Sequence, residues 1–263
     1  GKDTQYSATE AAQGITEMAK AGVATKDIIN GGLKGALSLA AAGQLEVGRA
    51  AEIAATAMNQ FGLAGKDLPH VADLFAAAAG KAQGSAEDVA QAMKFVGPVA
   101  KSLGVSIEET TGIIAEFASK GIIGEQAGTS FRGMLLSLTS PSAMAKKQMD
   151  ALGLSLYDAQ GKFVGMATVA EQMKVKLGVL TEEERNAALG RIFGNEQITA
   201  ATVLYQGGAA AVQEWTNAVN DSGFAAEQAA ALTDNLKGDL ERLGGAIDTA
   251  LIQGGSGANT ALR

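Results

Sequence analysis

Residues 85–103 read SAEDVAQAMKFVGPVAKSL, and this stretch carries the signals that predict the fold class. Ser85 precedes Asp88 by three residues, a near match to the capping box, in which two side chains satisfy free backbone N–H groups at a helix start. Apolar residues then recur at the spacing of a helix with one buried face: Val89, Ala92, Met93, Val96, Ala100 and Leu103. Gly97-Pro98 lies inside this helix, and we expect a kink there.

The same two signals recur along the chain. Four pairs match the capping box fully: Ser7/Glu10, Ser106/Glu109, Thr168/Glu171 and Thr181/Glu184. Two further apolar stripes have helical spacing: Ala11, Ala12, Ile15, Met18 and Ala19, and Ala50, Ile53, Ala54, Ala57, Met58 and Phe61. Alanine is abundant and there are only 3 prolines, so long helices can run without interruption. We therefore predict an all-α fold, an elongated array of antiparallel helix hairpins.

One segment departs from the helical pattern. Residues 154–164 read LSLYDAQGKFV, in which apolar residues alternate before a turn supplied by Asp158 and Gly161. We expect one small β-hairpin at this position.

A loose repeat of about 40 residues runs through the first half of the chain, as in an α-solenoid. Each copy places a glycine after a helix and an acid five residues later, and the glycines are Gly22, Gly62 and Gly104. We predict four regions: the helical array over 1–141, the β-hairpin with short helices over 142–222, a long C-terminal helix over 223–253 and a flexible tail over 254–263.

The expected C-terminal helix carries a narrow apolar seam. Its residues step by three or four, the pattern of a helix that pairs with another helix. We predict that this seam is a self-association face, formed by Leu232, Leu236, Leu240, Leu243, Ile247 and Leu251.

The composition excludes several function classes. The 263 residues include 28 Asp plus Glu, 21 Lys plus Arg, one His and no Cys, and the net charge is −7. Without cysteine there is no disulfide scaffold, thiol catalysis or Cys-based zinc site. A single histidine excludes multi-His metal centres. The acidic balance argues against specific nucleic-acid binding, and no apolar run approaches the roughly 18 residues of a membrane span.

The sequence also lacks the usual motifs of phosphate binding, hydrolysis and Ca²⁺ binding. The residues that invite a catalytic or binding role all have simpler interpretations. Gly31–Gly35 is interpreted as a joint between helices, and Glu182–Glu184 as acids that favour a helix start. His70 is interpreted as a surface or capping residue rather than a pH sensor, and Trp215 as helix packing rather than a partner anchor. We therefore expect no catalytic residue, cofactor or metal, and a chain that is not an enzyme.

A series of strings, in fixed order from about Thr9 to Leu243, carries a family resemblance. The strings are Phe61-Gly62-Leu63, 72–79 (ADLFAAAA), 93–100 (MKFVGPVA), 103–109 (LGVSIEE), 121–132 (GIIGEQAGTSFR), 138–141 (LTSP), the 154–164 segment and 192–196 (IFGNE). Ala127-Gly128-Thr129 and Phe193-Gly194 are the most specific. In this order and spacing the chain resembles the core region of phage tail tape measure proteins.

The resemblance implies a structural protein of a bacteriophage or prophage tail. Such a segment scaffolds assembly of the tail tube and helps to set tail length. The implied partners are the tail tube protein, tail assembly chaperones, tail-tip or baseplate proteins and further copies of the same chain. The implied place of assembly is the bacterial host cytoplasm, the implied location is the virion tail, and membrane contact is implied only during DNA ejection.

Two other functions stay open at this point. A tail-borne peptidoglycan hydrolase would need two converging carboxylates, which sequence spacing alone does not reveal. A membrane-inserting segment for DNA ejection could use helices rich in small residues, such as Gly35 to Gly43.

Overall fold

The computed structural model describes residues 6–233 together with Leu243 and Ile247. These residues are all-α and include no β-strand, as expected for the fold class. The chain divides into two compact units, one of residues 1–76 with 222–263 and the other of residues 77–221. Each unit is described by itself.

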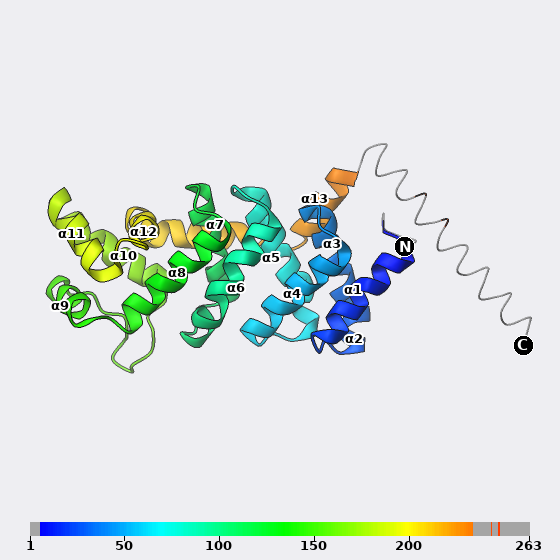
Figure 1. Ribbon diagram of the computed structural model, residues 1–263, viewed down its shortest axis with the longest axis horizontal. Coiled ribbons are helices and arrows are strands. Elements are labelled where there is room, and N and C mark those ends of the chain that lie inside the picture. The colour runs from blue at the N-terminus through cyan, green and yellow to red at the C-terminus, as the bar shows by residue number, and fades with distance from the viewer. Residues whose placement is uncertain (1–5, 234–242, 244–246, 248–263) are drawn as a thin grey trace, which may run out of the picture. The chain divides into compact units, whose positions relative to one another are not determined.

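The first unit contains the N-terminal helices and the C-terminal helix of the described chain. In order these are α1 (Ala8–Lys20), α2 (Thr25–Asp27), the π-helix η1 (Ile28–Gly32), α3 (Leu33–Gly43), α4 (Val47–Phe61), the 3-10 helix η2 (Gly65–Asp67), the start of α5 (Leu68–Lys81) and α13 (Phe224–Thr233). Helix α4 packs against α1 and α3, and α13 packs against α3 (Figure 1). The two ends of the described chain therefore meet in one core.

Of the two apolar stripes predicted in this unit, the one on α4 is buried and the one on α1 is mostly not. Every predicted stripe residue of α4 is buried, from Ala50 to Phe61. In α1 only Met18 of the predicted stripe is buried, and Ile15 is 41% exposed, so that stripe was wrong. The reason is Gly14, which the stripe omitted: it faces α4 so closely that a Cβ there would lie 2.9 Å from Val47. A helix that packs through a glycine buries a narrow face rather than a broad apolar one.

The second unit contains the remaining helices. They are the end of α5, α6 (Ala86–Ser102), α7 (Ile107–Ser119), α8 (Gly124–Thr139), α9 (Ala143–Leu152), α10 (Met166–Gly178), α11 (Glu182–Phe193) and α12 (Ile198–Val219). The main packed pairs are α6 with α8, α7 with α12, and α10 with α12. Helix α6 runs through Gly97-Pro98 with Pro98 inside it, and the expected kink there stays a prediction. Phe117 and Phe131 meet edge to face in the core, with ring centroids 5.8 Å apart.

The helix starts test the predicted capping boxes. Ser7/Glu10, Thr181/Glu184 and the near match Ser85/Asp88 form reciprocal boxes. Ser106 accepts a hydrogen bond from the Glu109 N–H at 3.1 Å, but the Glu109 carboxylate binds elsewhere. The box at Thr168 was wrong, because α10 begins at Met166 and Thr168 lies inside it.

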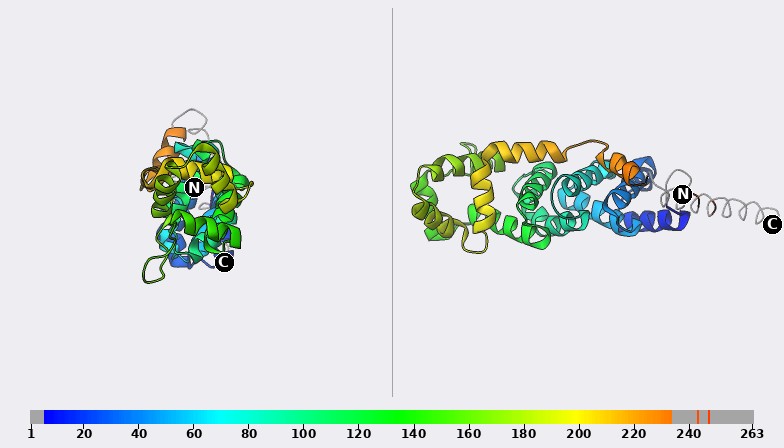
Figure 2. Two further views of the ribbon diagram at one scale, coloured as in Figure 1. Left: turned by 90° about the vertical axis from the view of Figure 1, so that its left-hand side faces the viewer. Right: turned by 90° about the horizontal axis from the view of Figure 1, so that it is seen from above.

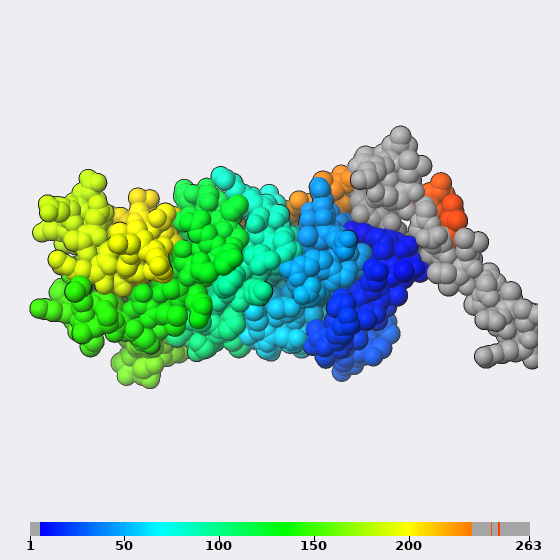
Figure 3. Space-filling model, viewed as in Figure 1, coloured from blue at the N-terminus to red at the C-terminus, as the bar shows by residue number. Residues whose placement is uncertain are grey.

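The 154–164 segment forms a tight turn, and the expected β-hairpin is not confirmed. Tyr157 and Phe163 form an isolated antiparallel bridge, and their rings pack edge to face. The Asp158 carboxylate accepts hydrogen bonds from the N–H groups of Gln160 and Lys162, both at 2.9 Å. The start of α10 at Met166 leaves no chain for a longer ladder. The turn protrudes as the yellow-green lobe at the lower edge of Figure 3.

Candidate functional site

The described residues offer no metal centre and no membrane helix. Within residues 6–233, no three His, Cys, Asp or Glu side chains are grouped so that they could hold a metal ion. In that same part of the chain, no helix is both long and apolar enough to cross a membrane.

The predicted self-association seam lies mostly outside the described residues. Leu236, Leu240 and Leu251 are not described, and α13 ends at Thr233. The described members are exposed: Leu232 by 40%, Leu243 by 57% and Ile247 by 51%. The seam stays a prediction.

The other residues singled out in the sequence lie apart from one another. His70 and Trp215 are half-buried, on α5 and α12. Glu182–Glu184 are exposed in the first turn of α11, where hydrogen bonds from Thr181 lower the pKa of Glu184. Gly31–Gly35 spans the junction of η1 with α3, and a Cβ on Gly35 would lie 2.8 Å from the backbone of Pro69. The structure does not bring these residues together into one site.

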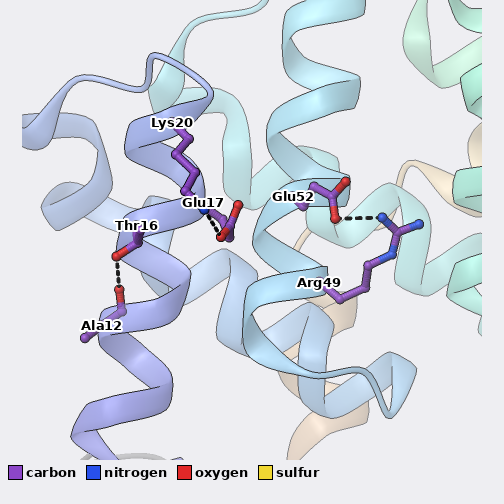
Figure 4. Close-up of polar contacts among 6 residues, drawn as sticks. All are labelled: Ala12, Thr16, Glu17, Lys20, Arg49 and Glu52. Atoms are coloured by element: carbon purple, nitrogen blue, oxygen red, sulfur yellow. Dashed lines mark hydrogen bonds and ion pairs between the residues drawn. The ribbon is translucent and has the colours of Figure 1, made fainter.

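Surface ion pairs on the first unit are local to single helices. Glu17 pairs with Lys20 on α1 at 2.7 Å, and Arg49 pairs with Glu52 on α4 at 2.8 Å (Figure 4). Exposed pairs of this kind typically contribute less than about 1 kcal/mol. They mark solvated helix faces rather than a functional site.

Three helix starts share an unusual arrangement, in which the cap comes from another helix. A glycine with positive φ comes directly before the helical residues of each: Gly165 before α10, Gly208 inside α12 and Gly223 before α13. Glycine has no side chain with which to cap the free N–H groups at a helix start. In all three cases a carboxylate from another helix accepts those hydrogen bonds. We call the acids Asp73, Glu109 and Glu171 the distant caps.

Asp73 of α5 caps α13. Its Oδ2 accepts from the Gly223 N–H at 2.8 Å, and its Oδ1 accepts from the Ala225 N–H at 3.0 Å. The two partners lie 150 and 152 residues away along the chain, within the same unit. A carboxylate at a helix N-terminus is favoured both by these bonds and by the helix dipole. Asp73 therefore ties the late part of the chain to the first unit.

Glu109 of α7 caps α10. Its Oε1 accepts from the Ala167 N–H at 3.1 Å. Burial raises the pKa of Glu109, and hydrogen bonds from the Ala167 and Met166 N–H groups oppose that rise. Glu109 also lines an open surface pocket with Ser106, Ala167, Val212, Gln213, Thr216 and Asn217. The bonds to α10 already occupy its carboxylate, so the geometry suits a structural role.

The third distant cap lies at a break in the middle of α12. Gly208 has φ 66° and ψ −162°, so the helix divides there into two segments (Figure 2, right). Glu171 of α10 accepts from the Ala209 N–H at 3.0 Å, which caps the second segment. Lys174 of α10 donates to the Gly207 carbonyl at 3.2 Å, which satisfies the end of the first segment. One turn of α10 thus closes both sides of the break.

Glu116 of α7 packs against the same break. The residue is only 2% exposed, and its Oε2 has no hydrogen-bond partner among the described residues. A Cβ on Gly207 would lie 2.5 Å from Glu116 Oε1 and 2.6 Å from Ala211 Cβ, so the Glu116 carboxylate lies very close to the Gly207 backbone. Burial raises the pKa of Glu116 to about 7; Lys120 opposes the rise and Glu214 adds to it.

These roles were not predicted from the sequence. Glu109 and Glu171 were predicted to cap their own helices, and no role was predicted for Asp73 or Glu116. One signal was available: a helix that begins after glycine, without Ser, Thr, Asp or Asn at its N-cap, needs an acceptor from elsewhere. The sequence did not indicate which acid would supply it.

Over the described residues the chain is an all-α protein in which three carboxylates cap the starts of other helices. More specifically, this chain belongs to the phage-related minor tail protein family, whose model matches residues 1–194. It is 39% identical over 253 residues to the tape measure protein of Pneumococcus phage Dp-1, covering 96% of this chain and 22% of that protein. It is 29% identical over 248 residues to the probable tape measure protein of Escherichia phage P2, covering 92% of this chain and 30% of that protein.

The chain therefore spans less than a third of either relative. No solved structure matches it. The family and both relatives confirm the resemblance drawn from the sequence, and neither relative's name describes an enzyme.

Proposed function

We propose that this chain is a segment of a tape measure protein of a phage tail, which scaffolds assembly of the tail tube and helps to set tail length. The observation that carries the proposal is the 39% identity to the Dp-1 tape measure protein along 96% of the chain. The segment then resides in the virion tail after assembly in the bacterial cytoplasm.

The physics of the fold supports a role in packing. A helix rises about 1.5 Å per residue, so a continuous helical form of this segment would span a distance in proportion to its length. The carboxylates of the distant caps join helices that are far apart in sequence. We propose that the helices form an elongated array of hairpins, with the four regions divided at residues 141, 222 and 253.

The partners are also proposals. They are the tail tube protein, tail assembly chaperones, tail-tip or baseplate proteins and other copies of this chain, which pair through the seam from Leu232 to Leu251. The exposure of Leu232, Leu243 and Ile247 is compatible with such pairing. We assign a contact surface only to pairing between copies of this chain, and none to the other proposed partners.

The test is an in-frame deletion of residues 9–243 from the parent gene, with tail length measured by electron microscopy. If the segment measures length as a helix, tails shorten by roughly 350 Å. Loss of tails altogether identifies the segment as a core needed to start assembly. A tandem duplication of the same residues is the matched control and should lengthen tails by a similar amount. Normal, infectious tails after the deletion would overturn the proposal.

A further inference from the structure

The break in α12 is built from groups that a continuous helix would not need. Gly208 occupies a backbone region that is essentially restricted to glycine. On either side of it, Glu171 and Lys174 replace the helix hydrogen bonds that the break removes. Residues on both sides are otherwise helical, so the backbone of Gly208 alone separates Ile198–Val219 from a continuous helix.

The bent form has a cost at Glu116. In this form Gly207 lies against the carboxylate, and Glu116 Oε2 is enclosed without a hydrogen bond from the described residues. A carboxylate enclosed in this way is tolerated when protonated, whereas an ionised one needs water or a cation. Movement of the first segment of α12 away from α7 would uncover Glu116 and give it water.

We propose that the Gly207–Gly208 break is a hinge controlled by protonation of Glu116. The bend is held while Glu116 is neutral, and α12 straightens when Glu116 ionises. The hinge lies wholly within the second unit and is independent of the proposed role in the tail.

Burial, rather than the charges around Glu116, sets this direction of control. Glu214 of α12 repels an ionised Glu116, and Lys120, the C-cap residue of α7, attracts it. Glu171 and Lys174 of α10 lie at the break itself, where both are bound to the α12 backbone. Burial raises the pKa of Glu116 from 4.5 to about 7 in the bent form. If the straight form restores the ordinary pKa, the straight-to-bent ratio rises roughly 30-fold between about pH 5.5 and about pH 8.5.

The chain has no cysteine, so two introduced cysteines can carry spin labels at chosen positions. Thr199 and Asn217 are exposed on the first and second segments of α12. In a continuous helix they would lie on the same face, with Cα atoms ~27 Å apart. Pulsed electron resonance of the doubly labelled full chain should show one shorter distance at about pH 5.5. At about pH 8.5 a second population near ~27 Å should appear.

Two labelled variants separate the hinge from general effects of pH. Glu116→Gln keeps the shape of the side chain but cannot ionise, so the short distance should persist at both pH values. Glu125→Gln changes an exposed acid on α8 and should behave like the parent chain. An unchanged distance in the parent chain would overturn the proposal. So would a pH-dependent shift that survives in Glu116→Gln.

Discussion

At the scale of single residues, four carboxylates have structural roles that their neighbours in the sequence do not indicate. Asp73, Glu109 and Glu171 each accept hydrogen bonds from the start of a distant helix, whereas Glu116 Oε2 is enclosed with no hydrogen-bond partner among the described residues. The first three use their charge, because a helix N-terminus favours an anion. Burial disfavours the charged form of Glu116, and the attraction of Lys120 offsets this only in part.

Removing the distant cap on α13 tests the first group. Asp73→Ala leaves the Gly223 and Ala225 N–H groups without their acceptor, so we expect a loss of about 1–2 kcal/mol in the free energy of unfolding. Urea denaturation followed by circular dichroism measures it. Asp150→Ala is the control, since the Asp150 side chain forms an exposed ion pair with Lys146 and no other ion pair with the described residues. It should cost less than about 1 kcal/mol, and equal losses in both variants would contradict the assignment.

The raised pKa of Glu116 predicts how the free energy of unfolding depends on pH. Its pKa is raised from 4.5 to about 7, so between these values the native state binds a proton that the unfolded state has released. The stabilising contribution is complete below about pH 4.5, declines as pH rises and is lost above about pH 7. The decline is at most about 3 kcal/mol. Urea midpoints from about pH 4.5 to about pH 8 should fall in the parent chain and flatten in Glu116→Gln; parallel curves would exclude Glu116 as the cause.

At the scale of elements, glycines determine where helices break and how closely they approach. Gly208 divides α12, and Gly14 brings α1 against α4. Neither effect follows from helix propensity alone, which treats a glycine in a helix as a modest penalty. What matters is the backbone conformation or the neighbour at each position.

Alanine substitution separates these two kinds of glycine. A Cβ on Gly208 would lie 2.5 Å from Lys174 and 2.8 Å from Glu171, in a backbone conformation closed to alanine. We expect Gly208→Ala to lower the free energy of unfolding by about 1–3 kcal/mol. Gly190→Ala in α11 meets nothing within 4 Å and should instead raise it by about 0.5–1 kcal/mol. Thermal unfolding of both variants measures these changes. A change of the same sign in both variants would contradict the role assigned to Gly208.

The apolar seam makes a separate prediction for the C-terminal region. Leu236→Ser with Leu240→Ser removes two of its six residues, so the self-associated fraction should fall in light scattering. Ile29→Ser removes an apolar side chain that is 75% exposed outside the seam and should leave the mass unchanged. A mass that is unaffected by the seam double variant would remove the seam as the contact.

At the scale of the whole molecule, the proposed elongated array has a simple consequence. A compact domain of this length has a radius of gyration of about 18 Å. We expect X-ray scattering of the monomer to give a clearly larger value, because helices stacked in a row extend in one direction. A concentration series separates the monomer from associated species, and a value near about 18 Å would contradict the array.

The amino-acid sequence by itself determined the all-α class, the buried stripe of α4 and the capping boxes at Ser7, Ser85 and Thr181. These depend on residues three or four apart, which a helix brings together without help from the rest of the chain. Ordered strings along the chain also carried the family. The sequence mispredicted the stripe of α1 and the box at Thr168, where a neighbouring helix or an earlier helix start took precedence.

The distant caps and the burial of Glu116 depend on tertiary packing and were visible only in the structure. Asp73 and Gly223 are 150 residues apart, and no local pattern relates them. The break at Gly208 needs Glu171 and Lys174 from α10, and the enclosure of Glu116 needs Gly207 from α12. Hydrogen bonding and desolvation act over a few ångströms in space, so they depend on which helices pack together rather than on which residues are neighbours in the chain.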